Sequence, residues 1–231
     1  MNLPAVALVG VNEEFGRTIT PFVSPPDSPN LHMLLAAADE RQKRLYMKPY
    51  ASGEAHSAIA SSEPGAEAAG MTTRAVKDGD HWVIDGRKIW ISRVPYADFT
   101  IVMALTDPEK RARGSITAFI VEKDTLGFIV EREIPMLGGA RTYEVVFENC
   151  RVHERQVLGQ VGNGFGPMQF RLTVRRLQIG AWCVGTARRA LKMIQWWIAD
   201  GATKVHAYSL IAMDTAAKQD RGEDVRTEAS I

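Results

Sequence analysis

Two short stretches of the chain carry residues that suit the binding of a polar aromatic molecule. The first is SSEPG at residues 61 to 65, a turn whose hydroxyl and backbone N–H groups can bind a ring edge or a phosphate. The second is IWIS at residues 89 to 92, in which Trp90 could form the wall of an aromatic ligand site. Taken alone, SSEPG also suits a surface turn, and a strand tryptophan usually packs in a core or on a sheet face. The residues themselves leave both interpretations open.

Three arginines open the last long stretch of the chain, RLTVRRLQIGAWCVG at residues 171 to 185. Arg171 and Arg175 are four residues apart and share one face of a helix, whereas Arg176 is turned by about a third of the circumference. An arginine that points inward would bind a carboxylate, a phosphate or a thioester-linked carrier. A solvated basic helix face is the alternative.

Other chemistries find little support in the residues. No cysteine pair and no histidine pair has the spacing of zinc ligands, and the five histidines are His32, His56, His81, His153 and His206. A hydrolase elbow of the form Gly-x-Ser-x-Gly is absent. GNGFG at residues 162 to 166 lacks the Lys-Ser/Thr of a phosphate loop and is interpreted as a tight turn before a helix. We therefore expect no metal.

The overall composition is that of an ordinary globular protein. With 28 basic and 27 acidic residues the formal net charge is +1, which gives no reason to expect nucleic acid or an anionic membrane as a partner. Cys150 and Cys183 form no disulfide framework, so a reducing compartment is expected. No apolar run reaches the ~18 residues of a spanning helix. We expect a soluble intracellular protein without a signal peptide.

Hydrophobic patterning divides the chain into three blocks in the order α, β, α. The first block has a proline-rich break at residues 21 to 30 and a helical pattern over residues 31 to 47, ended by Pro49 and Gly53. The second consists of short strands, with Asp85-Gly86 as the predicted turn of a hairpin. The last block is long enough for two helices. This order favours an α+β fold with helices segregated from an antiparallel sandwich or barrel.

Several motifs together, in their order, resemble the acyl-CoA dehydrogenase family. They are SSEPGAEAAGM, VKDGDHWVIDGRKIWIS, ADFTIVMALTD, FIVEKDTLGF, YEVVFENCRVHERQVLGQVGNGF and the arginine-bearing helix. The resemblance covers roughly residues 12 to 231. It implies a helical N-terminal part at residues 1–57, an antiparallel β middle domain at 58–152 and part of a C-terminal helical bundle at 153–231.

The resemblance also implies a site for FAD. In the family the tryptophan of the Trp-Ile-Ser/Thr motif packs against the flavin, and the hydroxyl residue two positions on reaches its redox-active edge. Trp90 and Ser92 match these positions. The hydroxyl residue before Glu-Pro-Gly contacts the pyrimidine side of the flavin and matches Ser62, with Ser61 beside it. Arg176 matches an inward arginine near the acyl-CoA cleft.

The family's reaction is the α,β-desaturation of an acyl-CoA thioester. A carboxylate removes the α proton, the β hydrogen leaves as hydride to the flavin, and an electron-transfer flavoprotein accepts the electrons. The resemblance further implies a homo-oligomer, a dimer or a tetramer, located in the bacterial cytoplasm or the mitochondrial matrix. Glu63, Glu67 and Glu144 lie near the motifs, but the family assigns none of them as the base, so the catalytic base is not identified.

The chain departs from the family pattern in ways that indicate an incomplete sequence. EPGAEAAG is shorter than the usual EPGAGSDAAG, and the MLGGARTYEVVF loop is short. RRALKMIQWWIADGATKVHA runs on without the connection that binds the FAD diphosphate in the family. The first and last helices are missing as well. We expect that the molecule contains further segments, at both ends and at three internal loops, that this sequence lacks. The alternative is a smaller protein that has lost these segments. Two further functions are therefore kept open, a non-catalytic interaction module and a flavin oxidase of the same fold.

Overall fold

A computed structural model describes residues 5–18, 28–65, 70–110, 112–137, 140–221 and 223 of the chain. Its contacts divide the chain into two compact units. The first unit consists of Met1–Phe22 with Leu177–Ile231, and the second is Val23–Arg176.

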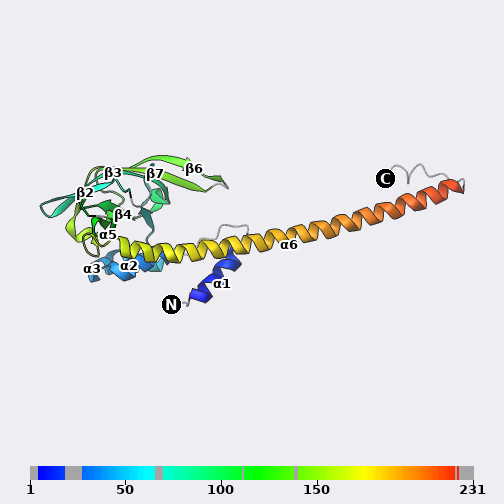
Figure 1. Cartoon of the computed structure of the whole chain (residues 1–231), viewed down its shortest axis with the longest axis horizontal. Coiled ribbons are helices and arrows are strands. Elements are labelled where there is room, and N and C mark those ends of the chain that lie inside the picture. The colour runs from blue at the N-terminus through cyan, green and yellow to red at the C-terminus, as the bar shows by residue number, and fades with distance from the viewer. Residues whose placement is uncertain are drawn as a thin grey trace. The chain divides into compact units, whose positions relative to one another are not determined.

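Eight strands of the second unit form one sheet. They are β1 (Ser57–Ala60), β2 (Arg74–Asp78), β3 (His81–Ser92), β4 (Phe99–Leu105), β5 (Ile116–Glu122), β6 (Phe128–Pro135), β7 (Arg141–His153) and β8 (Val157–Leu158). Their order is β6-β7-β3-β2-β4-β5-β8, with β1 paired to β4 off this path. Most neighbours are antiparallel, but β1 and β2 each pair with β4 in parallel. Figure 1 labels β2, β3, β4, β6 and β7 of this sheet.

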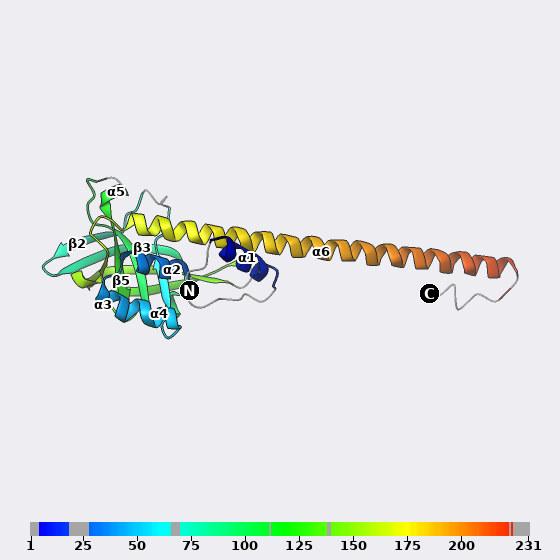
Figure 2. The same cartoon turned by 90° about the horizontal axis from the view of Figure 1, so that it is seen from below.

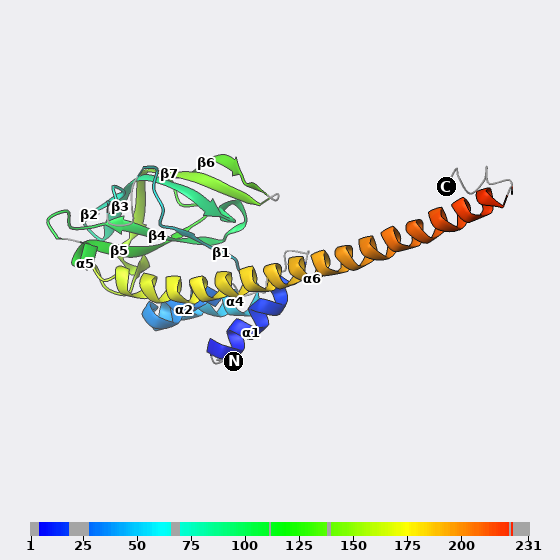
Figure 3. The same ribbon diagram turned by 45° about the vertical axis from the view of Figure 1, so that its right-hand side comes forward.

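Two apolar cores lie on opposite faces of β4 and β5. Because side chains alternate along a strand, Val102 and Phe119 point into a core shared with β3 and β7. Ile101 and Ile120 point the other way, into a core shared with the helices. Figure 3 shows β4 and β5 lying between β7 on one side and the helices α2, α4 and α6 on the other. The sheet therefore folds over its own first core, which is the sandwich-like packing that the strand pattern predicts.

Short helices precede the sheet and cover its second core. They are α2 (Ser28–Ala37), α3 (Glu40–Gln42), η1 (Lys43–Met47) and α4 (Lys48–Ser52). Figure 2 shows α2, α3 and α4 over β5. The helical pattern predicted over residues 31 to 47 is broken at Asp39, whose carboxylate accepts the N–H of Gln42 in a capping box and starts a new helix. Pro49 does not end the helix, because it lies in the first turn of α4, where its missing N–H costs nothing.

The structure places the predicted hairpin turn elsewhere. Asp85 and Gly86 lie inside the continuous strand β3, and the turn into β3 is made by Gly79 and Asp80, between the paired residues Asp78 and His81. Gly79 has φ of +60°, a conformation that glycine adopts readily. Gly86 is glycine for another reason: a Cβ there would lie 2.6 Å from the Cα of Thr73. The turn prediction at Asp85-Gly86 is therefore wrong.

The last block forms one helix, α6 (Phe165–Asp220), where two were predicted. After Pro167, in the first turn, α6 has no proline, and an isolated glycine such as Gly201 is tolerated within a helix. In the first unit α1 (Ala5–Gly16) crosses α6, where Glu13 pairs with Arg188 and the Thr186 hydroxyl donates to the carbonyl of Gly16 at 3.0 Å.

The predicted α+β class is confirmed, and three further short elements complete it. They are α5 (Ala112–Ser115) and the 3₁₀ turns η2 (Val94–Tyr96) and η4 (Glu154–Gln156). The division into three domains at residues 57/58 and 152/153 stays a prediction. Within the described ranges, no helix combines the length and the apolar character that crossing a membrane requires.

Candidate functional site

An irregular pairing at the end of β3 determines the environment of Trp90. Lys88 pairs with Val145 of β7, but the next pairing is between Ile91 and Tyr143. Three steps on β3 thus oppose two on β7, which makes a β-bulge with one extra residue at positions 89 and 90. Trp90 itself has φ of +59°, rare for a large side chain. Strained backbone of this kind concentrates at functional sites.

The bulge turns Trp90 out of the core. Along β3 the even-numbered residues Trp82, Ile84 and Lys88 are buried, so unbroken alternation would bury residue 90 as well. The extra residue reverses the alternation, so that Ile91 is buried and Trp90 is 57% exposed. Ser92 is exposed next to it on the same strand. An aromatic face and a hydroxyl are therefore displayed together on the surface.

The SSEPG turn lies against this part of β3. The N–H of Ile89 donates to the carbonyl of Ser62 at 2.9 Å, and Nζ of Lys88 donates to the carbonyl of Ser61 at 3.3 Å. Ser61 is half-buried and Ser62 is exposed. The structure therefore brings the four sequence-predicted residues Ser61, Ser62, Trp90 and Ser92 into one neighbourhood. We call residues 61–65 together with residues 88–92 the Trp90 site.

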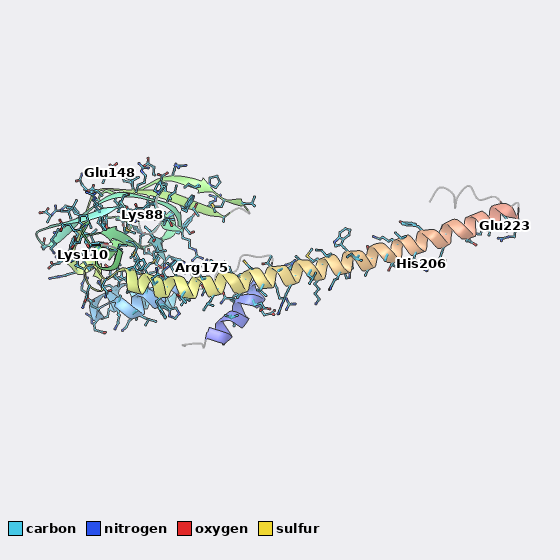
Figure 4. The ribbon with its side chains drawn as sticks, in the orientation of Figure 1. Lys88, Lys110, Glu148, Arg175, His206 and Glu223 are labelled. Atoms are coloured by element: carbon cyan, nitrogen blue, oxygen red, sulfur yellow. The ribbon has the colours of Figure 1, made fainter. Side chains whose placement is uncertain are left out.

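A buried ion pair joins the two parts of the Trp90 site. Lys88, which is 0% exposed, donates to Glu63 Oε1 at 2.7 Å, and Glu63 is 5% exposed. The other donors to Glu63 are Thr72, through its N–H and hydroxyl, both at 2.6 Å, and the N–H of Thr73 at 2.9 Å. Figure 4 marks Lys88 within the sheet.

The environment shifts the pKa of both partners. Burial opposes the charged form of Glu63, but the Lys88 charge and the hydrogen bonds from Lys88, Thr72 and Thr73 outweigh it and lower its pKa to about 2. Burial lowers the pKa of Lys88 to about 8, although its bond to Glu63 opposes that change. Both groups are therefore charged at neutral pH.

Lys88 is a residue of the site that was not predicted from the sequence. The sequence does contain a sign of its burial. Lys88 is an even-numbered residue of β3, like the buried Trp82 and Ile84, so strand alternation places its side chain on the buried face. A lysine at such a position needs a buried counter-charge. Glu63 in the SSEPG motif is that counter-charge.

The Trp90 site has the chemistry to hold one face and one polar edge of a planar heteroaromatic ring. An exposed indole offers a stacking surface, and the hydroxyls of Ser62 and Ser92 offer hydrogen bonds. A flavin ring, which is planar with polar atoms along its edges, fits this set of groups.

Arg176 lies on α6, where its side chain is exposed. The buried arginine of this helix is Arg171, whose Nε donates to Asn30 Oδ1 at 2.7 Å. Asn30 in turn donates to the hydroxyl of Ser57 at 2.9 Å. Arg171 therefore links α6 to α2 and β1, and the role of Arg176 at a substrate cleft stays a prediction.

The carboxylates near the motifs are engaged in ion pairs. Glu144 on β7 lies between Arg87, at 2.9 Å, and Arg132, at 2.6 Å. The hydrogen bond from Arg87, aided by Arg132, lowers the pKa of Glu144. Glu67 lies outside the described residues. In the part of the chain that the structure describes, no group of three or more His, Cys, Asp or Glu side chains could hold a metal ion.

Known proteins match the chain in both sequence and fold. Residues 58–150 match the family described as acyl-CoA dehydrogenase, middle domain. The chain is 38% identical over 233 residues to (R)-benzylsuccinyl-CoA dehydrogenase of Thauera aromatica, which covers 90% of this chain and 57% of that protein. It is 32% identical over 246 residues to a subunit of the caffeyl-CoA reductase–Etf complex of Acetobacterium woodii, covering 95% of this chain and 65% of that subunit.

The fold is also similar to solved structures. An acyl-CoA dehydrogenase from Geobacillus kaustophilus aligns with a TM-score of 0.71 and 26% identity, over 100% of this chain and 68% of that one. The chain spans little more than half the length of the Thauera relative.

Proposed function

This chain belongs to the acyl-CoA dehydrogenase family, and on that premise we propose that it binds FAD and acts in the α,β-desaturation of an acyl-CoA thioester. Its homologues support a flavin-dependent acyl-CoA oxidoreductase as the general class. Within this general class, we propose FAD as the flavin and α,β-desaturation as the reaction.

The observation that carries the proposal is the Trp90 site. A bulge exposes a tryptophan that regular alternation would bury, and it does so beside a loop that presents two serines. We propose that the Trp90 indole packs against the flavin ring, that Ser92 donates to its redox-active edge, and that Ser62, with Ser61, contacts its pyrimidine side. When bound, the flavin would supply a hydride acceptor. A donor fixed at that edge would stabilise the negative charge that develops there.

Neither of the two buried carboxylates, Glu63 and Glu144, suits the role of the general base. A base must have a pKa near the working pH to take up a proton efficiently. The pKa of Glu63 is about 2, and the pKa of Glu144 is also lowered. Both carboxylates are therefore too weakly basic to accept a proton at neutral pH. Glu63 and Glu144 are therefore assigned to structure.

We further propose acyl-CoA as the substrate, with Arg176 contributing to its binding, and an electron-transfer flavoprotein as the acceptor. The complex of the Acetobacterium relative with Etf supports such an acceptor. A homo-oligomer is the proposed assembly, supported by an exposed apolar face on α6 that includes Met193 and Trp197.

The test is anaerobic reduction of the FAD-loaded protein by a series of acyl-CoA thioesters. The visible flavin band is expected to bleach with at least one saturated thioester and to return when an electron acceptor is added. Bleaching followed by hydrogen peroxide formation in air without another acceptor would identify an oxidase instead. FAD binding without bleaching by any thioester would favour the non-catalytic module and would contradict the proposal.

A further inference from the structure

We propose that the Lys88–Glu63 ion pair is a positioning device that sets the SSEPG loop and the Trp90 bulge at the spacing that FAD requires. The inference rests on the proposed function, because it assigns a role to residues beside the proposed flavin site. Neither Lys88 nor Glu63 is assigned a contact with the cofactor.

Glu63 ties the SSEPG segment to residues 72 and 73. Its carboxylate accepts two hydrogen bonds from Thr72 and one from Thr73, so residue 63 is fixed to residues 72 and 73. Thr73 is fully buried, and its carbonyl accepts the N–H of Leu105 on β4 at 2.8 Å. The carboxylate therefore anchors the loop to the interior of the sheet.

Lys88 and Ile89 attach the SSEPG segment to β3. The ammonium group of Lys88 reaches both Glu63 and the carbonyl of Ser61, and the next residue, Ile89, donates its N–H to Ser62. Lys88 is also the last residue in register with β7 before the bulge that carries Trp90. One side chain thus fixes the serines of the loop and the start of the bulge.

The charges of this pair are better explained by geometry than by stability. A buried ion pair is weak support for stability, since well-packed apolar residues often serve as well or better. An ion pair with several directed hydrogen bonds does, however, specify one geometry, as a supporting shell around a binding site must. The Lys88–Glu63 pair, with its additional bonds to Ser61, Thr72 and Thr73, has this character.

The experiment compares two double variants of the full 231-residue chain that leave the net charge unchanged. Lys88→Met with Glu63→Gln removes the ion pair, while the glutamine carbonyl can still accept from the threonine N–H groups. Lys77→Met with Glu154→Gln makes the same substitutions in an exposed ion pair of the same unit. The dissociation constant for FAD is measured by fluorescence titration, and the exchange rate of the Ile89 amide is measured by hydrogen exchange without FAD.

Removing the Lys88–Glu63 pair is expected to weaken FAD binding by about tenfold or more and to speed Ile89 exchange by a similar factor. Bound flavin should fluoresce more strongly, because Trp90 would be less well placed to quench it. The exposed pair should change neither quantity by more than about twofold. An unchanged FAD affinity, or an unchanged Ile89 exchange rate, in the folded Lys88–Glu63 variant would overturn the proposal.

If circular dichroism shows that this double variant does not fold, Glu63→Asp takes its place, because it keeps the charge and shortens the side chain by one methylene. FAD binding is expected to weaken and Ile89 exchange to speed up, both by less than in the double variant, and wild-type values would overturn the proposal. If the wild-type chain binds no FAD, the proposed function fails, and unchanged Ile89 exchange in the variants would then show separately that the ion pair does not hold the loop.

Discussion

At the scale of single residues, β3 contains two tryptophans with opposite roles. Trp82 is buried in the first core and packs edge-on against Phe119, with ring centroids 5.6 Å apart. Trp90 is exposed, with a backbone conformation that costs on the order of 1–3 kcal/mol in a residue other than glycine. Trp90 is both strained in its backbone and exposed in its side chain. This combination is better explained by a role in binding than by a role in core packing.

Substitution at the two positions should therefore separate stability from binding. Trp90→Gly is expected to change the free energy of unfolding by no more than about 1 kcal/mol, because relief of the positive φ offsets the lost contacts. It should nevertheless weaken FAD binding. Trp82→Ala should cost about 3–5 kcal/mol through the cavity it leaves. Urea unfolding and FAD titration measure the two effects, and an undiminished FAD affinity of Trp90→Gly would contradict the assignment of the site.

Glu63 should make stability depend on pH in the acid range. Its folded-state pKa of about 2 lies below the ordinary value of 4.5, so its contribution is complete above pH 4.5 and is lost as the pH falls toward 2. The lost contribution is roughly 2–3 kcal/mol. Urea unfolding at intervals between pH 5 and pH 2 should show this loss in the wild type.

Glu63→Gln should be less stable at neutral pH and should lack this part of the acid dependence, whereas Glu148→Gln, which changes an exposed carboxylate on β7, should keep it. Equal pH dependence in the wild type and Glu63→Gln would show that the carboxylate is not held as described.

At the scale of elements, the close approach of β3 to the start of β2 fixes the sheet around the Trp90 site. Gly86→Ala would place a methyl group 2.6 Å from the Cα and the hydroxyl oxygen of Thr73, at a φ of +149°. The expected destabilisation is about 2–4 kcal/mol. Gly201→Ala on α6, where a Cβ meets nothing within 4 Å, should instead stabilise the helix by about 0.5–1 kcal/mol. Thermal unfolding of both variants checks the contrast, which would be refuted if Gly86→Ala were tolerated.

The succession of elements could be predicted from local patterning, but the irregularities that make the site could not. Alternation and turn residues are local signals, and they predicted the strands and the helical ends of the chain. Whether Asp85-Gly86 forms a turn or a close strand contact depends on Thr73, which is distant in sequence. The bulge at Trp90 depends on the register with β7, which is set by long-range pairing.

The same reasoning applies to the residues of the candidate site. Ser61, Ser62, Trp90 and Ser92 were identified through the family resemblance, and the structure places them together. Lys88 was missed because an isolated lysine in a strand resembles an ordinary exposed residue. Only a comparison with Trp82 and Ile84 shows that alternation along β3 places it on the buried face. The short EPGAEAAG segment, with Glu67, lies partly outside the described residues.

At the scale of the whole molecule, α6 carries an apolar face in the first unit. Ala190, Met193, Ile194, Trp197 and Ile198 recur at helical spacing and line one surface, and Trp197 is 67% exposed. Apolar helix faces of this kind are normally buried against another surface. A second copy of the chain is the occupant that the proposed homo-oligomer would supply.

Concentration-dependent association is therefore expected for the 231-residue chain, measured by sedimentation velocity. Met193→Glu with Trp197→Glu should shift the distribution toward monomer, because each charge would have to be buried at the interface. Gln195→Glu adds a charge on a different face of α6 and should leave association unchanged. A wild-type chain that stays monomeric at every concentration would contradict this expectation.

The measurement that tests the account most directly is a titration of FAD into the purified chain, followed by flavin fluorescence. Saturable quenching is expected for the wild type and for Trp196→Leu, which removes an exposed tryptophan of α6. Trp90→Leu should bind more weakly and quench less. If the wild type shows no saturable binding, or if Trp90→Leu matches it, the exposed tryptophan of β3 is not part of a flavin site.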